Sequence, residues 1–143
     1  MDNLKIKKLV EDAIIPEYKT KGAAGMDVCS VDDVTLQPME FKIVKTGLAM
    51  AIPNGYEVQV RPRSGMACKL GVTVINTPGT IDEDYRGEIG VGLINLSQTE
   101  KFIEKGTRIA QLVVNKVEQP VIEVVEELDE TERGAGGFGS TGK

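Results

Sequence analysis

Short stretches in which apolar and polar residues alternate, separated by turn residues, constrain the fold of this chain more than any other feature. In Tyr56–Arg61 three apolar side chains alternate with three polar ones, so the two sets lie on opposite faces of an extended strand. Turn-forming sequences such as Pro53-Asn54-Gly55 and Thr77-Pro78-Gly79 separate these stretches. Helical periodicity is nearly absent. We therefore predict an all-β sandwich or barrel built from many short strands.

The same reasoning places further strands and one short helix along the chain. The helix is predicted over residues 65–70, with Ser64 as its N-cap and Gly71 at its end. The other predicted strands cover residues 4–7, 39–43, 72–75, 89–95, 107–115 and 121–125.

Length and charge narrow the class of protein. The 143 residues fit one domain. With 17 basic and 22 acidic residues the net charge is −5, which argues against binding a nucleic-acid backbone. No apolar run approaches the roughly 20 residues of a membrane span. The N-terminal residues 1–5 lack the apolar stretch of a signal peptide, so we expect a cytoplasmic location without membrane attachment.

The absence of histidine restricts the chemistry further. It excludes Ser-His-Asp and Cys-His catalysis and histidine-ligated zinc. Catalysis by this chain must use carboxylates, hydroxyls, Lys, Arg or a hard metal ion held by oxygen. The two cysteines, Cys29 and Cys68, fit neither a disulfide framework nor a zinc site, and we interpret both as small buried hydrophobic residues.

Three segments admit a functional and an ordinary structural interpretation. Arg63-Ser64-Gly65 at the predicted helix start suits a phosphate group, but arginines at strand ends are commonly just surface residues. The acidic residues of 80–88 either act chemically or simply shape a hairpin turn. After an acidic stretch, the Gly-rich tail from Arg133 onward is predicted to be mobile without a ligand. Its Phe138 is either unanchored or a ring that stacks on a flat group.

Taken together, five segments resemble the homotrimeric deoxyuridine triphosphatase (dUTPase) family, in the family's order and over most of the chain. The departures are mild: Val28 stands where Leu is usual, and Thr80 where an aliphatic residue is usual. The segments are Ala24-Gly25-Met26-Asp27-Val28, Pro62-Arg63-Ser64-Gly65-Met66-Ala67, Gly79-Thr80-Ile81-Asp82-Glu83-Asp84-Tyr85-Arg86-Gly87, Arg108-Ile109-Ala110-Gln111, and residues 133–142 from Arg133 to Gly142.

The resemblance implies a fold and a reaction. It implies a jelly-roll-like β-barrel subunit that forms a homotrimer with shared active sites. The first, second and fourth segments of a site would come from one chain, the third from another and the tail from the remaining one. The enzyme would hydrolyse dUTP to dUMP and pyrophosphate with Mg²⁺, keeping uracil out of DNA and supplying dUMP for thymidylate synthesis. Residues 1–125 would form the β domain, and residues 126–143 the acidic linker and C-terminal lid.

The resemblance also implies roles for individual residues. Asp82 would deprotonate a water that attacks the α-phosphorus. The substrate's phosphates and water would chelate Mg²⁺, with Asp27 acting only through a water. Arg108 would contact either the substrate or the neighbouring subunit at the interface. The phosphate-binding residues would be Arg63, Ser64, Gly65 and Gln111.

The rest of the substrate would meet the third segment and the tail. Uracil would lie in a hairpin pocket, and Tyr85 would pack on deoxyribose and exclude the 2′-hydroxyl of UTP. Phe138 would stack on the uracil, and the other tail residues would close on the phosphates. The pocket residues would be Asn76, Gly79, Thr80, Ile81, Asp82, Tyr85 and Gly90, and those of the tail Arg133, Phe138, Gly139, Ser140 and Thr141.

Two other functions stay open. A dCTP deaminase of the same fold would need different active-site residues and lacks the third segment in this form. A regulatory nucleotide-binding protein would signal to a protein partner through its bound state. The chain has no sizeable insertion between the second and third segments, so housekeeping catalysis is the simpler interpretation.

Overall fold

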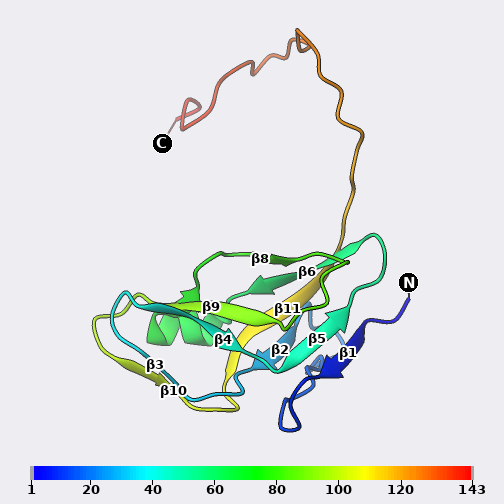
Figure 1. The fold of residues 1–143 in the computed structure, drawn as a ribbon. Coiled ribbons are helices and arrows are strands. Elements are labelled where there is room, and N and C mark those ends of the chain that lie inside the picture. Colours follow the sequence, from blue (N-terminus) through cyan, green and yellow to red (C-terminus); the bar gives the residue numbers. More distant parts are fainter. Residues whose placement is uncertain (1, 143) are drawn as a thin grey trace.

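The computed structural model describes residues 2–142. Met1, the first residue of the predicted β domain (1–125), and Lys143, the last residue of the predicted linker and lid (126–143), lie outside the described residues. Strand β6 (Tyr56–Arg61) lies within a four-stranded antiparallel sheet in the order β2-β11-β6-β8 (Figure 1). Its partners are β2 (Met26–Cys29), β11 (Arg108–Lys116) and β8 (Gly79–Ile81). This sheet carries four of the five segments identified in the sequence or leads directly into them.

A second sheet and two strand pairs complete the body. The second sheet has the order β4-β9-β7, formed by β4 (Phe41–Lys45), β9 (Gly90–Asn95) and β7 (Val72–Val74). β1 (Lys5–Lys8) pairs with β5 (Leu48–Ala51), and β3 (Val34–Leu36) pairs with β10 (Lys101–Ile103). Both sheets contribute to one core, which contains Val58, Leu112, Val91 and Leu93. The predicted all-β architecture is confirmed.

Within residues 2–142 the one helical segment is a turn of π-helix, η1 (Met66–Leu70), which directly follows the helical residues Ser64 and Gly65. Gly71 ends it in the left-handed conformation, with φ of 72°, as predicted from the sequence. The predicted cap is wrong: Gly65 is the N-cap, and no side chain caps the turn by a hydrogen bond. Ser64 is exposed instead.

Six of the seven predicted strands are present: 4–7 corresponds to β1, and 39–43 overlaps β4, which begins two residues later than predicted. The predictions around Tyr56–Arg61, 72–75, 89–95 and 107–115 match the observed strands to within one residue at each end. The predicted strand at 121–125 is wrong, because this segment is extended coil with Val121 96% exposed. The strands missed were β2, β3, β5, β8 and β10, each of three or four residues.

The two cysteines differ from each other. Cys29 is buried as predicted, and burial, followed by the nearby Asp27 carboxylate, raises the pKa of its thiol. The prediction for Cys68 is wrong, because it lies exposed on η1. A single π-helical turn has only one side facing the core, and Met66 occupies it.

The side of the β4-β9-β7 sheet that faces away from the core is also apolar. Phe41 and Ile43 are 63% and 78% exposed. Ile43 and Ile75 lie beside glycines of β9: a Cβ at Gly90 would lie 2.6 Å from Ile43 Cγ2, and one at Gly92 would lie 3.0 Å from Ile75 Cγ2. We call Phe41, Ile43 and Ile75 the outer face. Exposed apolar side chains gathered in this way are typical of an interaction surface.

The chain beyond β11 leaves the body, as Figure 1 shows, and runs away from it as a long arm. Residues 117–142 contain no strand or helix. The apolar side chains of Val121, Ile122, Val124 and Leu128 are all at least 84% exposed. Over the described residues, no helix is long and apolar enough to cross a membrane.

Candidate active site

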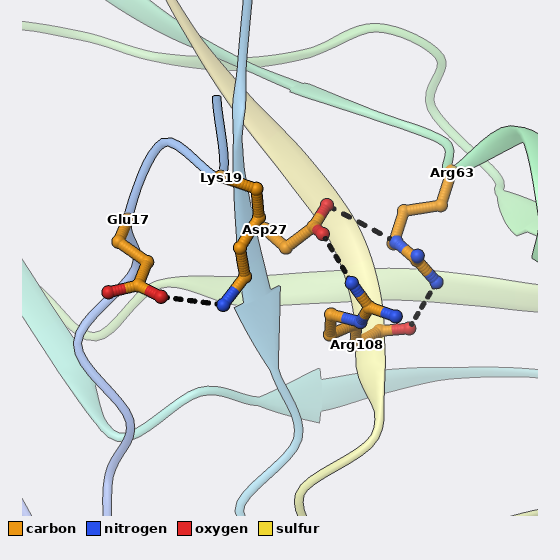
Figure 2. A network of polar contacts seen from close by, with 5 residues as sticks. All are labelled: Glu17, Lys19, Asp27, Arg63 and Arg108. Atoms are coloured by element: carbon orange, nitrogen blue, oxygen red, sulfur yellow. Dashed lines mark hydrogen bonds and ion pairs between the residues drawn. The ribbon is translucent and has the colours of Figure 1, made fainter. Parts of the chain in front are cut away.

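Asp27 is the centre of a charged cluster on the first sheet. Its Oδ1 accepts a hydrogen bond from Arg63 Nε at 3.2 Å, and its Oδ2 accepts one from Arg108 Nη1 at 3.3 Å (Figure 2). Arg63 Nη1 also donates to the Arg108 carbonyl oxygen at 3.4 Å. One carboxylate thus holds two guanidinium groups, so the three side chains together keep one net positive charge. Such a cluster suits a phosphate group.

Strand pairing brings these residues together from distant parts of the sequence. Arg108 lies opposite Cys29 in the β2–β11 pair, and Gln111 lies opposite both Asp27 on β2 and Arg61 on β6. Gln111 Nε2 donates to the Pro62 carbonyl oxygen at 3.0 Å and so fixes the loop that carries Arg63. Gln111 keeps one amide hydrogen for another partner.

Gly25 allows this arrangement to form. A Cβ at this position would lie 2.8 Å from Gln111 Oε1 and 3.2 Å from the Leu112 carbonyl oxygen. A larger residue would therefore displace Gln111. Ser64 and Gly65 are exposed beside the cluster, where a hydroxyl and backbone N–H groups face solvent.

A second polar pair flanks the Asp27 cluster. Lys19 Nζ donates to Glu17 Oε1 at 2.6 Å, and Figure 2 shows this pair in the same view as the Asp27 cluster. The ammonium group of Lys19, hydrogen-bonded to the carboxylate, lowers the pKa of Glu17. Both side chains are more than half exposed, so the pair contributes little to stability. Nothing in the sequence distinguishes Glu17 and Lys19 from other charged surface residues, so this pair was not predicted.

The loop between β8 and β9 carries the second group of predicted residues. Thr80, Ile81, Asp82, Tyr85 and Gly90 line a hollow of about 230 Å³, together with Glu88 and Ile89. Binding sites for whole small molecules usually measure about 300–1,000 Å³. The hollow therefore fits part of a nucleotide rather than all of it.

Asn76 and Gly79 lie before this loop and do not line the hollow: Asn76 is in the turn between β7 and β8, and Gly79 is the first residue of β8. A Cβ at Gly79 would lie 3.5 Å from Asn76 Nδ2, and one at Gly92 would lie 3.7 Å from Asn76 Oδ1. The Asn76 amide therefore lies between β8 and β9. Gly90 borders both the hollow and the outer face, because Ile43 fills the place of its missing side chain.

The two groups of residues lie far apart within one chain. In the β6–β8 pair Ile81 lies opposite Val58, which places Asp82 beside Glu57, and these two residues line one hollow. Arg61 lies four residues further along β6, about 13 Å away at the usual rise of a strand. One chain therefore does not bring Asp82 to the Asp27 cluster.

The predicted tail residues also lie away from both groups. Phe138 is fully exposed, and residues 133–142 make only short-range hydrogen bonds, such as Arg133 Nε to the Gly136 carbonyl oxygen at 2.8 Å. Gly139, Ser140 and Thr141 are exposed as well. Phe138 and Gly139 both have positive φ, at 52° and 82°, so the tail bends sharply at its aromatic residue.

The side chains offer little for a metal ion to bind directly. Within residues 2–142, no three His, Cys, Asp or Glu side chains form a group that could hold one. Both Asp27 oxygens already accept hydrogen bonds from arginine. Each oxygen keeps a further lone pair, so Asp27 suits a contact to a metal-bound water.

Comparison with known proteins identifies the family. A sequence model of dUTPase matches residues 11–142. The chain belongs to the dUTPase family. A deoxyuridine 5′-triphosphate nucleotidohydrolase from Nautilia profundicola is 62% identical over 140 residues, covering 98% of this chain and 99% of that protein. The resemblance found in the sequence is therefore confirmed.

Solved dUTPase structures have the same fold. A dUTPase variant from Staphylococcus bacteriophage 80alpha, with dUpNHpp, has a TM-score of 0.93 at 32% identity and covers all of both chains. A variant from phage phi11 of S. aureus, in which a structural Mg(II) ion is coordinated, has a TM-score of 0.84 at 28% identity. It covers 90% of this chain and 100% of that one.

Proposed function

We propose that this chain hydrolyses dUTP to dUMP and pyrophosphate, keeping uracil out of DNA and supplying dUMP for thymidylate synthesis. Its membership of the dUTPase family, over residues 11–142, carries the proposal. The two groups of polar residues at opposite ends of β6 support it. One group suits the phosphates, and the other suits the base and sugar.

The phosphate end is assigned to the Asp27 cluster and its neighbours. Arg63 and the exposed Ser64-Gly65 backbone bind phosphate oxygens, and Gln111 holds the Arg63 loop in place while offering its remaining N–H. Mg²⁺ on the triphosphate supplies charge neutralisation for the leaving pyrophosphate. Asp27 accepts a hydrogen bond from a water of that ion.

The base and sugar are assigned to the β8–β9 loop. Asn76 and the main chain from Gly79 to Gly90 offer donors and acceptors that match the edge of uracil. A site that pairs with a base in this way rejects cytosine, because mismatched polar groups would stay buried without partners. Tyr85 borders the hollow and packs on the deoxyribose, which leaves no room for a 2′-hydroxyl.

The reaction itself needs a base for the attacking water. Asp82 is assigned this role because it is an exposed carboxylate at the edge of the hollow, and the chain has no histidine. The water attacks the α-phosphorus in line with the leaving pyrophosphate. Because water is the nucleophile, no covalent intermediate with the protein is required.

A complete site requires more than one chain, and a homotrimer provides it. The separation of about 13 Å along β6 supports this assembly, since Asp82 of one chain can then face the phosphate group of another. The outer face supports it too, because Phe41 and Ile43 are exposed in the single chain. Residues 126–142 of the acidic linker and lid extend away from the body of their own chain (Figure 1), and in the assembly the lid closes on the site of a neighbour.

The outer face gives a testable prediction about assembly. We expect Ile43→Asp to convert the trimer into monomers, because it places a charge in the centre of an apolar contact. Size-exclusion chromatography with light scattering measures the mass. Phe102→Asp is the matched control, since Phe102 is 62% exposed but lies on β10, which pairs with β3 and is not part of the β4-β9-β7 sheet. A trimeric Ile43→Asp protein would place the interface elsewhere.

Incubation with single nucleotides tests the function itself. The protein is supplied with Mg²⁺ and, separately, dUTP, dCTP, dTTP or UTP, and the products are separated by ion exchange. We expect conversion of dUTP alone, to dUMP and pyrophosphate. Deaminated products from dCTP would instead indicate a deaminase. Binding of dUTP without turnover of any nucleotide would favour the regulatory function, and a pull-down with and without dUTP would then test for a protein partner.

A further inference from the structure

The loop between β8 and β9 is folded back on itself by a set of local hydrogen bonds. Tyr85 N donates to the Asp82 carbonyl oxygen at 3.1 Å, and the Tyr85 hydroxyl donates to the Glu88 carbonyl oxygen at 2.8 Å. Arg86 Nη1 donates to the Glu83 carbonyl oxygen at 2.6 Å. The Tyr85 ring therefore lies across the loop, with its hydroxyl held at the far side.

Gly87 lies directly against this ring. A Cβ on Gly87 would lie 2.6 Å from Tyr85 Cζ and 3.0 Å from Cε1, and it would meet the hydroxyl oxygen as well. Gly87 does not have the positive φ that strains other residues. An alanine at this position therefore meets no backbone strain, and its only effect is to take the space that the ring occupies.

We propose that Gly87 is a positioning residue for sugar selection: by leaving room for the Tyr85 ring, it holds that ring as the wall of the hollow that excludes a ribonucleotide. The inference rests on the proposed hydrolysis of dUTP. Tyr85 lines the hollow together with Asp82, so a displaced ring opens the wall next to the sugar. Glu88 holds the other end of the ring, because its carbonyl oxygen accepts the hydrogen bond of the Tyr85 hydroxyl at 2.8 Å.

The experiment compares kcat/KM for dUTP and UTP in Gly87→Ala and in the wild type. We expect the dUTP-to-UTP ratio to fall by about 10-fold, the scale on which one displaced pocket wall changes discrimination. A merely structural loss of stability lowers both rates together and leaves their ratio unchanged. Gly22→Ala is the control, because Gly22 has open space around it and no positive φ.

A double-mutant cycle tests whether Gly87 acts through Tyr85. Tyr85→Ala by itself lowers the ratio if Tyr85 selects the sugar. In that background Gly87→Ala has no ring to displace, so we expect no further change. An unchanged ratio in active Gly87→Ala, or an equal fall in both backgrounds, would overturn the inference.

Two further outcomes are distinguishable. If Tyr85→Ala leaves the ratio unchanged while dUTP is still hydrolysed, both the sugar-selecting role of Tyr85 and the inference for Gly87 are wrong, but the proposed reaction stands. If Gly87→Ala does not fold, the Gly87→Ala/Tyr85→Ala double variant decides. Its recovery of folding, measured by circular dichroism, supports the contact between residue 87 and the ring, and its failure to fold contradicts it.

Discussion

Asp82→Asn is expected to lower kcat for dUTP by about 10²–10⁴-fold, the usual contribution of a general base. The amide keeps the size and polarity of the side chain but cannot accept the proton of the attacking water. Within the described residues, the Asp82 carboxylate makes no hydrogen bond or ion pair that the substitution would break. We therefore expect folding, assembly and dUTP binding to stay unchanged.

The neighbouring acidic residues provide controls. Glu83 Oε2 accepts a hydrogen bond from Gly55 N at 2.5 Å and is engaged in holding the loop. Asp84 is exposed and does not line the hollow of about 230 Å³ that Asp82 and Tyr85 border. Steady-state kinetics of Asp84→Asn should therefore match the wild type. Equal losses in Asp82→Asn and Asp84→Asn would mean that the loop acts through its total charge, and near-normal turnover in Asp82→Asn would assign the base elsewhere.

Alternation in the sequence predicts strands but not what covers them. The alternation of Met39, Phe41 and Ile43 predicts a strand at 39–43, and the observed strand β4 begins two residues later, at Phe41. These three side chains are exposed rather than in the core. In the same strand only Val44 is buried. A period of two residues separates the two faces of a strand, and it is the same whether the apolar face meets a core or another subunit.

The segment at 121–125 shows that a strand-like sequence does not by itself form a strand. Its residues favour a strand, but a strand requires a hydrogen-bonding partner, and residues 121–125 make no backbone hydrogen bond to another segment of the described chain. Five of the short strands were missed for a different reason. Three or four residues, as in β8 (Gly79–Ile81), contain too few repeats to distinguish alternation from chance.

The sequence could predict the members of the site more easily than their arrangement. The five segments pointed to Asp27, Arg63 and Gln111, but the contacts of Asp27 reach across 36 residues to Arg63 and 81 residues to Arg108. Such contacts depend on the register of β2, β11 and β6, which no local spacing reveals. The space that Gly87 leaves for Tyr85 depends on the fold of the loop, although both residues belong to one predicted segment.

Removal of residues 133–143 is expected to lower kcat/KM for dUTP by about 10²–10³-fold, the scale of losing charge-stabilising donors at the transition state. In the proposed site the tail would contribute Arg133, Ser140, Thr141 and the stacking ring of Phe138, and the arm that carries them runs away from the body of its own chain. The trimer should persist, because the truncation leaves the outer face intact. Full activity without the tail would show that the lid is not needed.

Mixed trimers of two inactive variants test which chain supplies the tail. Asp82→Asn chains keep an intact tail, and truncated chains keep an intact Asp82. If the two parts of one site come from different chains, every mixed trimer contains one intact site in three, so isolated mixed trimers should regain about one third of wild-type activity. Co-expression with two different affinity tags isolates them. If Asp82 and the tail of a site came from the same chain, no mixed trimer would have an intact site. The regained activity therefore measures directly whether the extended arm crosses to a neighbour, which the wide separation of Phe138 from its own Asp82 hollow leads us to expect.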